Sequence, residues 1–143
     1  MKFKRKPISK MSDRGRLRKE IGRIHLEILK RDRGDVCEIS GRPVNGLGRF
    51  HILEVSTNPR LEFVDENVLL VNWLPHHFNW HHYGEGSPRN ALTLKRIKEL
   101  RGDDYREKLK ERERYCGTMD MLYLMALKTT MQKELEALQK GSI

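Results

Sequence analysis

Residues 51–82 read HILEVSTNPRLEFVDENVLLVNWLPHHFNWHH, and this stretch decides the fold that the sequence predicts. Two short apolar segments, 50–55 and 61–64, flank an Asn58-Pro59 pair, a pattern typical of two strands joined by a turn. A further apolar run then leads to Pro75, and proline is favoured in the first turn of a helix. The order strand, strand, helix is therefore the expectation for the centre of the chain.

Histidines are concentrated in the same stretch. Five of the six lie in it, and four fall on the predicted helix. His77 and His81 are four residues apart, so a helix places both imidazoles on one face, at a separation suited to a single divalent metal ion. His76 and His82 lie beside them. The alternative interpretation is an exposed polar helix with stacked aromatic side chains, but the apolar aromatics between the histidines favour the metal site.

His51 stands alone in the first predicted strand. If the strands bring it opposite the helix, its neutral imidazole can remove a proton from water near a metal ion that stabilises the phosphorane charge and the leaving oxygen. Asn67 comes just before the last apolar run, where its side chain can hold the loop that carries His51 through hydrogen bonds to the backbone. Simple turn capping is the alternative role of Asn67. The pattern predicts a small hydrolytic nuclease site.

The net positive charge of the chain lies entirely in its first 33 residues. These hold 13 Lys and Arg against 4 Asp and Glu, whereas the rest of the chain holds 16 of each, which accounts for the formal charge of +9. We expect residues 1–10 to be a flexible arm attracted to a polyanion, and residues 13–30 to form a basic amphipathic helix with Ser12 or Asp13 as its cap. A solubilising tail and a merely solvated helix face are the alternatives. The expected phosphate contacts are Lys4, Arg5, Lys6, Arg14, Arg18, Arg42 and Arg49.

Beyond Pro88 the sequence is helical in pattern almost to its end, in three segments separated near Gly102 and Cys116. The last segment carries an apolar seam with three- and four-residue spacing. It consists of Leu124, Leu127, Met131, Leu135 and Leu138. The seam predicts either ordinary core or a homodimer interface. With about one domain's worth of residues, the chain divides into an arm (1–10), a helix with the central core (11–88) and a helical extension (89–143).

Several classes of protein are excluded by the composition. The longest uncharged apolar run, 68–74, is far shorter than the roughly 20 residues of a membrane helix. Residues 11–20 read MSDRGRLRKE, which is not the apolar centre of a secretory signal, so we expect a cytoplasmic protein without a membrane partner. Cys37 and Cys116 lie far apart without CxxC spacing, so neither a disulfide framework nor a complete cysteine zinc site is expected.

From His51 onward the chain resembles the HNH or ββα-metal endonucleases. In that family a histidine and a second strand precede the pattern Asn-Leu-x-x-Leu-Cys-x-x-Cys-His, and here Asn67-Val-Leu-Leu-Val-Asn-Trp-Leu-Pro-His76 keeps its nine-residue spacing. The resemblance implies an α+β fold with a ββα-metal core, to which an N-terminal basic helix and a helical C-terminal region are added. It implies His51 as the general base, Asn67 as the structural asparagine, and His76 or His77 with His81 as ligands. The ligand set implies one divalent metal ion, with Mg²⁺ or Mn²⁺ expected before Zn²⁺.

Two further stretches narrow the resemblance. RDRGDVCEISGR (31–42), followed by LEFVDENV (61–68), is similar to phage NinG/Rap recombination nucleases. The similarity covers roughly residues 20–110. It implies action on DNA, in particular on branched DNA such as Holliday junctions or D-loops, in the cytoplasm of a bacterial host.

The chain also departs from the family pattern. The four cysteine positions of the usual structural zinc knuckle hold Cys37, Ser40, Asn72 and Pro75, so a structural zinc knuckle is not expected. Many members carry aspartate directly before the base, where this chain has Phe50. Glu54 or Glu38 could supply the missing carboxylate. The alternative function is therefore a catalytically degenerate module that binds nucleic acid without cutting it.

Overall fold

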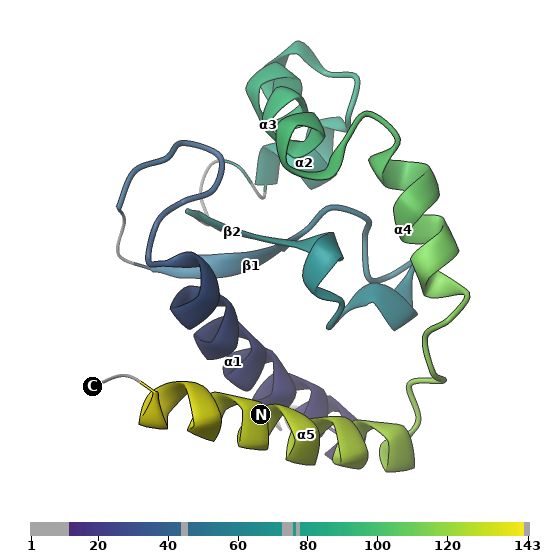
Figure 1. Cartoon of the computed structure of the whole chain (residues 1–143). Helices are drawn as coiled ribbons and strands as arrows, with labels where there is room; N and C mark the ends of the chain where they lie inside the picture. Colours follow the sequence, from purple (N-terminus) through teal and green to yellow (C-terminus); the bar gives the residue numbers. More distant parts are fainter. Residues whose placement is uncertain (1–11, 44–45, 73–75, 77, 142–143) are drawn as a thin grey trace, which may run out of the picture.

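The computed structural model describes residues 12–43, 46–72, 76 and 78–141. Within these residues a two-stranded antiparallel sheet is surrounded by helices (Figure 1). The α+β class that the sequence predicts is therefore confirmed. Lys4, Arg5, Lys6, Pro75 and His77 lie outside the described residues, so the arm and the predicted start of the histidine helix are not described further.

The predicted basic helix is present as α1 (Asp13–Arg33), and both of its ends are capped by hydrogen bonds. Ser12 Oγ accepts the backbone N–H of Gly15 at 3.1 Å, which satisfies one of the free donors of the first turn. At the other end Gly34 has φ of 88° and donates its N–H to the carbonyl of Lys30, a left-handed conformation that favours glycine. The prediction of a helix that begins after Ser12 is therefore confirmed.

The sheet uses a different second strand from the one predicted. Strand β1 (Leu47–His51) pairs with β2 (Val68–Asn72), with His51 opposite Val68. The predicted strand at 61–64 is wrong, because Pro59–Leu61 forms the 3-10 helix η1 and a turn follows it. The carbonyls of Leu61 and Glu62 accept hydrogen bonds from side chains instead of from a neighbouring strand. The predicted first strand, 50–55, is displaced and ends at His51.

Both faces of the sheet are covered, which explains why β2 is one continuous apolar run instead of an alternating one. Leu69 and Val71 pack into a core with Phe50 and with residues of three helices, α2 (Phe78–Tyr83), α3 (Ala91–Arg101) and α4 (Tyr105–Glu113). Val68 and Leu70 pack on the other face against Leu29 of α1. The sheet therefore lies between α1 on one face and α2, α3 and α4 on the other (Figure 1).

Two of the three C-terminal helices, α3 and α4, are part of the same packing. Ile97 of α3, and Tyr105 and Leu109 of α4, share one core with Phe50 of β1, so the predicted sections 11–88 and 89–143 meet in a common interior. Gly102 ends α3 with φ of 97°, as the sequence predicts. The last helix, α5 (Met121–Lys140), begins at Asp120, whose carboxylate accepts the N–H of Tyr123 at 2.8 Å.

The apolar seam of α5 packs against α1 within the same chain. Leu124 and Met131 are buried with Ile21 and Ile28 of α1, and the remaining seam residues are partly buried in the same cluster. The two helices cross on the side of the sheet opposite α3 (Figure 1). The seam is thus ordinary core, and the surface on which the expectation of a homodimer rested is covered by α1. Among the described helices none is long and apolar enough to cross a bilayer.

Replacing Leu124 by Ala is expected to lower the free energy of unfolding by about 3 kcal/mol, because a fully buried leucine leaves a cavity. Its side chain is 0% exposed, whereas that of its helix neighbour Leu122 is 79% exposed. Leu122→Ala is therefore the matched control, with an expected change below about 0.5 kcal/mol. Urea unfolding of both variants measures this. Equal losses at the two positions would contradict the packing of α5 on α1.

Candidate active site

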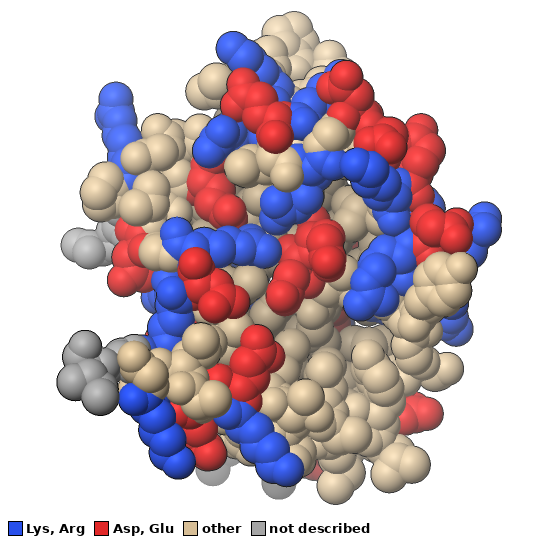
Figure 2. Space-filling view, in the orientation of Figure 1, with Lys and Arg blue, Asp and Glu red and all other residues tan. Residues whose placement is uncertain are grey.

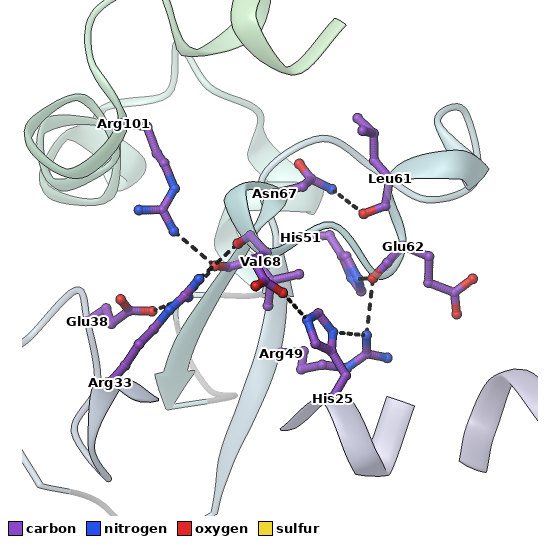
Figure 3. Close-up of polar contacts among 11 residues, drawn as sticks. His25, Arg33, Glu38, Arg49, His51, Leu61, Glu62, Asn67, Val68 and Arg101 are labelled. Atoms are coloured by element: carbon purple, nitrogen blue, oxygen red, sulfur yellow. Dashed lines mark hydrogen bonds and ion pairs between the residues drawn. The ribbon is translucent and has the colours of Figure 1, made fainter. Parts of the chain in front are cut away.

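His51 lies at the end of β1 with its ring orientation fixed by a backbone carbonyl. His51 Nε2 lies 2.9 Å from the carbonyl oxygen of Glu62 (Figure 3). A carbonyl only accepts, so Nε2 carries the proton and Nδ1 holds the lone pair. Burial lowers the pKa of His51 to about 4, with the bond to Glu62 opposing this and the charge of Arg49 adding to it. His51 is therefore neutral at neutral pH, with its lone pair on Nδ1.

Asn67 ties the loop that follows His51 to the start of β2. It lies in the 3-10 helix η2 (Asp65–Asn67) and is 0% exposed. Its Oδ1 accepts the N–H of Leu53 at 2.8 Å, and its Nδ2 donates to the carbonyls of Leu53 at 3.1 Å and Leu61 at 3.4 Å. The side chain thus has the hydrogen bonds to the His51 loop that the sequence predicts for it, which turn capping alone does not provide.

His81 of α2 lies near the same loop because of two contacts, a hydrogen bond from Trp80 and a ring contact with Phe50. Trp80 Nε1 donates to the carbonyl of Ile52 at 3.0 Å, so α2 is bonded to the backbone directly after His51. The His81 ring centroid is 5.8 Å from that of Phe50. His81 Nδ1 lies 3.1 Å from Glu54 Oε1. Glu54, which is three residues beyond His51, therefore forms a carboxylate and imidazole pair with His81.

Glu54 and His81 are of residue types that bind divalent metal ions. The 3.1 Å contact between them is a hydrogen bond from Nδ1 to the carboxylate, so in the neutral ring the lone pair of His81 is on Nε2. Within the described residues no group of three or more His, Cys, Asp or Glu side chains could hold a metal. His76 is half-buried, which lowers its pKa, and no ligand contact places it with the pair. His77 is outside the described residues.

Of the two carboxylates that the sequence offers in place of aspartate, only Glu54 is at the site. Glu38 forms an ion pair with Arg33 at 3.1 Å and accepts the N–H of Leu70 at 2.6 Å. Phe50, which occupies the aspartate position, is fully buried in the core. The structure therefore brings together His51, Asn67, Glu54 and His81.

A network of polar side chains, buried at His25 and exposed at Asp65, lies behind His51. Arg49 Nη1 contacts His25 Nδ1 at 3.2 Å and donates to the carbonyl of Glu62, the same oxygen that His51 contacts (Figure 3). Arginine only donates, so His25 carries its proton on Nε2, which lies 2.7 Å from Asp65 Oδ1. A Cβ on Gly22 of α1 would lie 2.5 Å from Arg49 Nη2, so glycine at this position makes room for the guanidinium.

The predicted phosphate contacts are placed in different ways. Arg14 donates to the carbonyl of Met119 at 2.8 Å, and Arg18 forms an ion pair with Glu62 at 2.6 Å. Arg49 is largely buried in the network behind His51, and Arg42 is exposed in the loop before β1. The structure thus commits Arg14, Arg18 and Arg49 to contacts within the chain and leaves Arg42 at the surface.

The described surface carries little of the positive charge. Residues 1–11 hold 5 Lys and Arg and no acid, so the described residues hold 29 − 5 = 24 against 20 Asp and Glu, a net +4 out of +9. On the face shown in Figure 2, basic and acidic side chains are interspersed without a broad field of one sign. The remaining +5 of the formal charge lies in residues 1–11.

Three of the four positions aligned with a zinc knuckle meet in the structure. Cys37 Sγ accepts the N–H of Ser40 at 3.5 Å and that of Asn72 at 3.4 Å. Burial raises the pKa of the Cys37 thiol, but hydrogen bonds from Ser40, Asn72 and Ile39 outweigh burial and lower it. A hydrogen-bonded sulfur thus joins the turn after α1 to the end of β2. Pro75, the fourth position, is outside the described residues.

Two residues at or next to this site, Glu54 and His25, were not predicted from the sequence with a definite role. Glu54 was recognisable as a carboxylate three residues after His51, but only the fold shows that it reaches His81. His25 lies on the apolar face of a basic helix, where the periodicity gives no sign that its ring contacts Arg49 and Asp65.

The pKa of His51 predicts how stability depends on pH without metal. The unfolded imidazole binds a proton near its ordinary value of 6.5, whereas the folded one does so only near 4. The contribution of His51 to the free energy of unfolding is therefore complete above pH 6.5. It decreases by at most about 3 kcal/mol as the pH drops from 6.5 to 4, and it changes no further below pH 4. Thermal unfolding in EDTA should show a shallower acid dependence for His51→Gln than for wild type. Identical dependences would contradict a buried, neutral His51.

Comparison with protein families, with curated proteins and with solved structures finds no match to this chain. The assignment of a function therefore rests on the residues and geometry described above.

Proposed function

We propose that the protein is a metal-dependent endonuclease of HNH type that hydrolyses DNA phosphodiesters. The observation that carries the proposal is the position of His51. Its proton is held on Nε2 by the Glu62 carbonyl, its Nδ1 has the lone pair at neutral pH, and a carboxylate and imidazole pair follows on the adjoining loop and helix. A neutral base beside a partial ligand set is what hydrolysis by activated water requires.

Each residue has one role in the proposed reaction. His51 Nδ1 takes the proton of the attacking water. Asn67 keeps the loop after His51 in place through the two backbone groups of Leu53. Arg49 keeps a positive charge beside His51 and orients the Glu62 carbonyl that fixes the imidazole tautomer.

Glu54 and His81 are the residues that hold the metal, together with the predicted ligands His76 or His77. Mg²⁺ or Mn²⁺ suits a carboxylate and imidazole set, since such ions keep several water ligands and need few from the protein. When bound, the ion supplies positive charge that stabilises the oxygens of the reacting phosphate.

The proposed substrate is DNA, and branched DNA in particular. The face shown in Figure 2 has mixed charge without an extended basic path, and the arm with Lys4, Arg5 and Lys6 adds to the attraction to phosphates. Exposed Arg42 is the described candidate for a direct contact. The preference for branched DNA rests on the resemblance to phage recombination nucleases.

Metal binding tests the ligand assignment separately from cleavage. Replacing His81 by Ala or Glu54 by Gln is expected to weaken Mn²⁺ binding at least about tenfold, as loss of a ligand does. His82→Ala is the matched control, because His82 is on the same helix but stacks on Phe78 at 4.9 Å. Titration with Mn²⁺ followed by electron paramagnetic resonance measures the three variants. Equal affinities for all of them would remove Glu54 and His81 from the metal site.

The second candidate is a degenerate module that binds nucleic acid without cutting. It is favoured by Phe50, which is fully buried at the position of the aspartate. In this case the protein shifts the mobility of DNA in a gel in the presence of any metal but does not cut it. His51→Ala then changes neither the mobility shift nor the intactness of the DNA.

A further inference from the structure

Two arginines that end their helices meet at one backbone oxygen. Arg33 is the last residue of α1, and Arg101 is the last residue of α3. Both donate to the carbonyl of Val68, Arg33 from Nη1 at 2.6 Å and Arg101 from Nη2 at 3.2 Å (Figure 3). Two guanidinium groups this close repel each other. Burial lowers the pKa of Arg101, and the charge of Arg33 lowers it further.

The repulsion is offset by acceptors from a single short segment. Arg33 Nη2 also donates to the carbonyl of Asp65 at 2.9 Å, and Arg101 Nε donates to the carbonyl of Glu66 at 2.9 Å. With Val68, the carbonyls on both sides of Asn67 are bound by these two side chains. We call Arg33 and Arg101 the arginine clamp.

Besides the carbonyl of Val68, the first residue of β2, a carboxylate connects the clamp to the sheet. Glu38 Oε2 pairs with Arg33 and also accepts the N–H of Leu70 in β2. The clamp thus joins the ends of α1 and α3 to η2 and to β2, and it fixes the backbone from which the Asn67 side chain projects.

The contacts continue from the clamp to the metal ligand. Asn67 binds both backbone groups of Leu53, and the next residue is Glu54, whose carboxylate lies 3.1 Å from His81. We propose that Arg33 and Arg101 are positioning residues, which set the place of Glu54 at the metal site through Asn67 and Leu53. The part of this inference that concerns metal binding rests on the proposed function.

The proposed role depends on the shape of arginine and not only on its charge. Arg101 reaches the carbonyls of Glu66 and Val68 with two different nitrogens. A lysine keeps the charge but ends in one ammonium nitrogen, which cannot reproduce the planar fork. Arg101→Lys therefore separates a positioning role from a general electrostatic one.

The first test is hydrogen exchange of the Leu53 amide, measured by NMR on the full chain. We expect Arg101→Ala and Arg101→Lys to speed exchange of this amide about tenfold, equivalent to about 1.4 kcal/mol. The control is Lys95→Ala, at an exposed position of the same helix, which should leave the rate unchanged. Exchange at Leu124, in the contact between α1 and α5, should stay at the wild-type rate. An unchanged Leu53 rate in both Arg101 variants would overturn the clamp.

The second test is the affinity for Mn²⁺ in the same variants. Because Arg101 acts on Glu54 only through Asn67 and Leu53, we expect Arg101→Lys to weaken Mn²⁺ binding by no more than the tenfold change expected for the Leu53 amide, that is, by about threefold to tenfold. Wild-type affinity in Arg101→Lys with faster Leu53 exchange would overturn the link to Glu54. A wild-type protein that binds no Mn²⁺ would refute the proposed function, whereas the Leu53 rates would still decide the clamp. If Arg101→Ala does not fold, Arg101→Lys carries both tests.

Discussion

His51→Ala is expected to slow phosphodiester cleavage by about 10²- to 10⁴-fold, the range that a general base contributes. His51 has the proton fixed on Nε2 by the Glu62 carbonyl and a pKa of about 4. The imidazole is therefore already in the state that accepts a proton from water. No other described imidazole has both features. Single-turnover cleavage of labelled DNA at saturating Mn²⁺ measures the rate.

Two controls separate a loss of chemistry from a loss of structure or binding. Affinity for DNA, measured in EDTA, should remain at the wild-type value in His51→Ala. His82→Ala changes an exposed imidazole on α2 that stacks on Phe78, and it should cleave at the wild-type rate. A His51→Ala rate within a few-fold of wild type would exclude His51 as the base.

Asn67→Ala is expected to lower the free energy of unfolding by roughly 2–4 kcal/mol. Asn67 is fully buried and makes three hydrogen bonds to the backbone of Leu53 and Leu61. Its removal takes the partner from the N–H and the carbonyl of Leu53, each of which costs on the order of 1–3 kcal/mol when water does not replace it. The carbonyl of Leu61 keeps the N–H of Val64 at 3.3 Å. Denaturant unfolding with the midpoint and slope fitted separately measures the loss.

Asn67→Asp separates the contribution of the hydrogen bond that Oδ1 accepts from that of the two that Nδ2 donates. It has the shape of asparagine and keeps an acceptor for the Leu53 N–H, but it replaces the two donations from Nδ2 by a carboxylate oxygen facing carbonyls. We expect it to be as unstable as Asn67→Ala at pH 8 and to recover part of the loss near pH 4, where the acid is protonated and donates again. Wild-type stability of both variants would show that the loop does not depend on Asn67.

The sequence predicts the helices well because their signals are local. Ser12 before α1 and Gly102 after α3 are where the caps are found, and the three- and four-residue spacing in α5 correctly marks a buried face. The sequence also predicts that the Asn67 side chain bonds to the backbone of the loop that carries His51, and the structure has these bonds to Leu53.

The strand pairing and the charged contacts could not be derived in the same way. The segment 61–64 has the composition of a strand, but its carbonyls are bound by His51, Arg49 and Asn67, which come from outside the segment. Arg18 and Arg49 have the charge of phosphate contacts, yet the fold places Glu62 beside both of them. The conformation of 61–64 and the contacts of Arg18 and Arg49 depend on residues that are distant in sequence. Sequence periodicity contains no information about such contacts.

The most direct test of the central claim is cleavage by the purified wild-type protein. Labelled linear, nicked and four-way DNA are each incubated with Mg²⁺, with Mn²⁺ and with EDTA. The proposed function predicts cutting with either metal, none with EDTA, and faster cutting of the four-way substrate. Binding to these DNAs without cutting in any metal would contradict the nuclease and leave the degenerate module as the function of the fold.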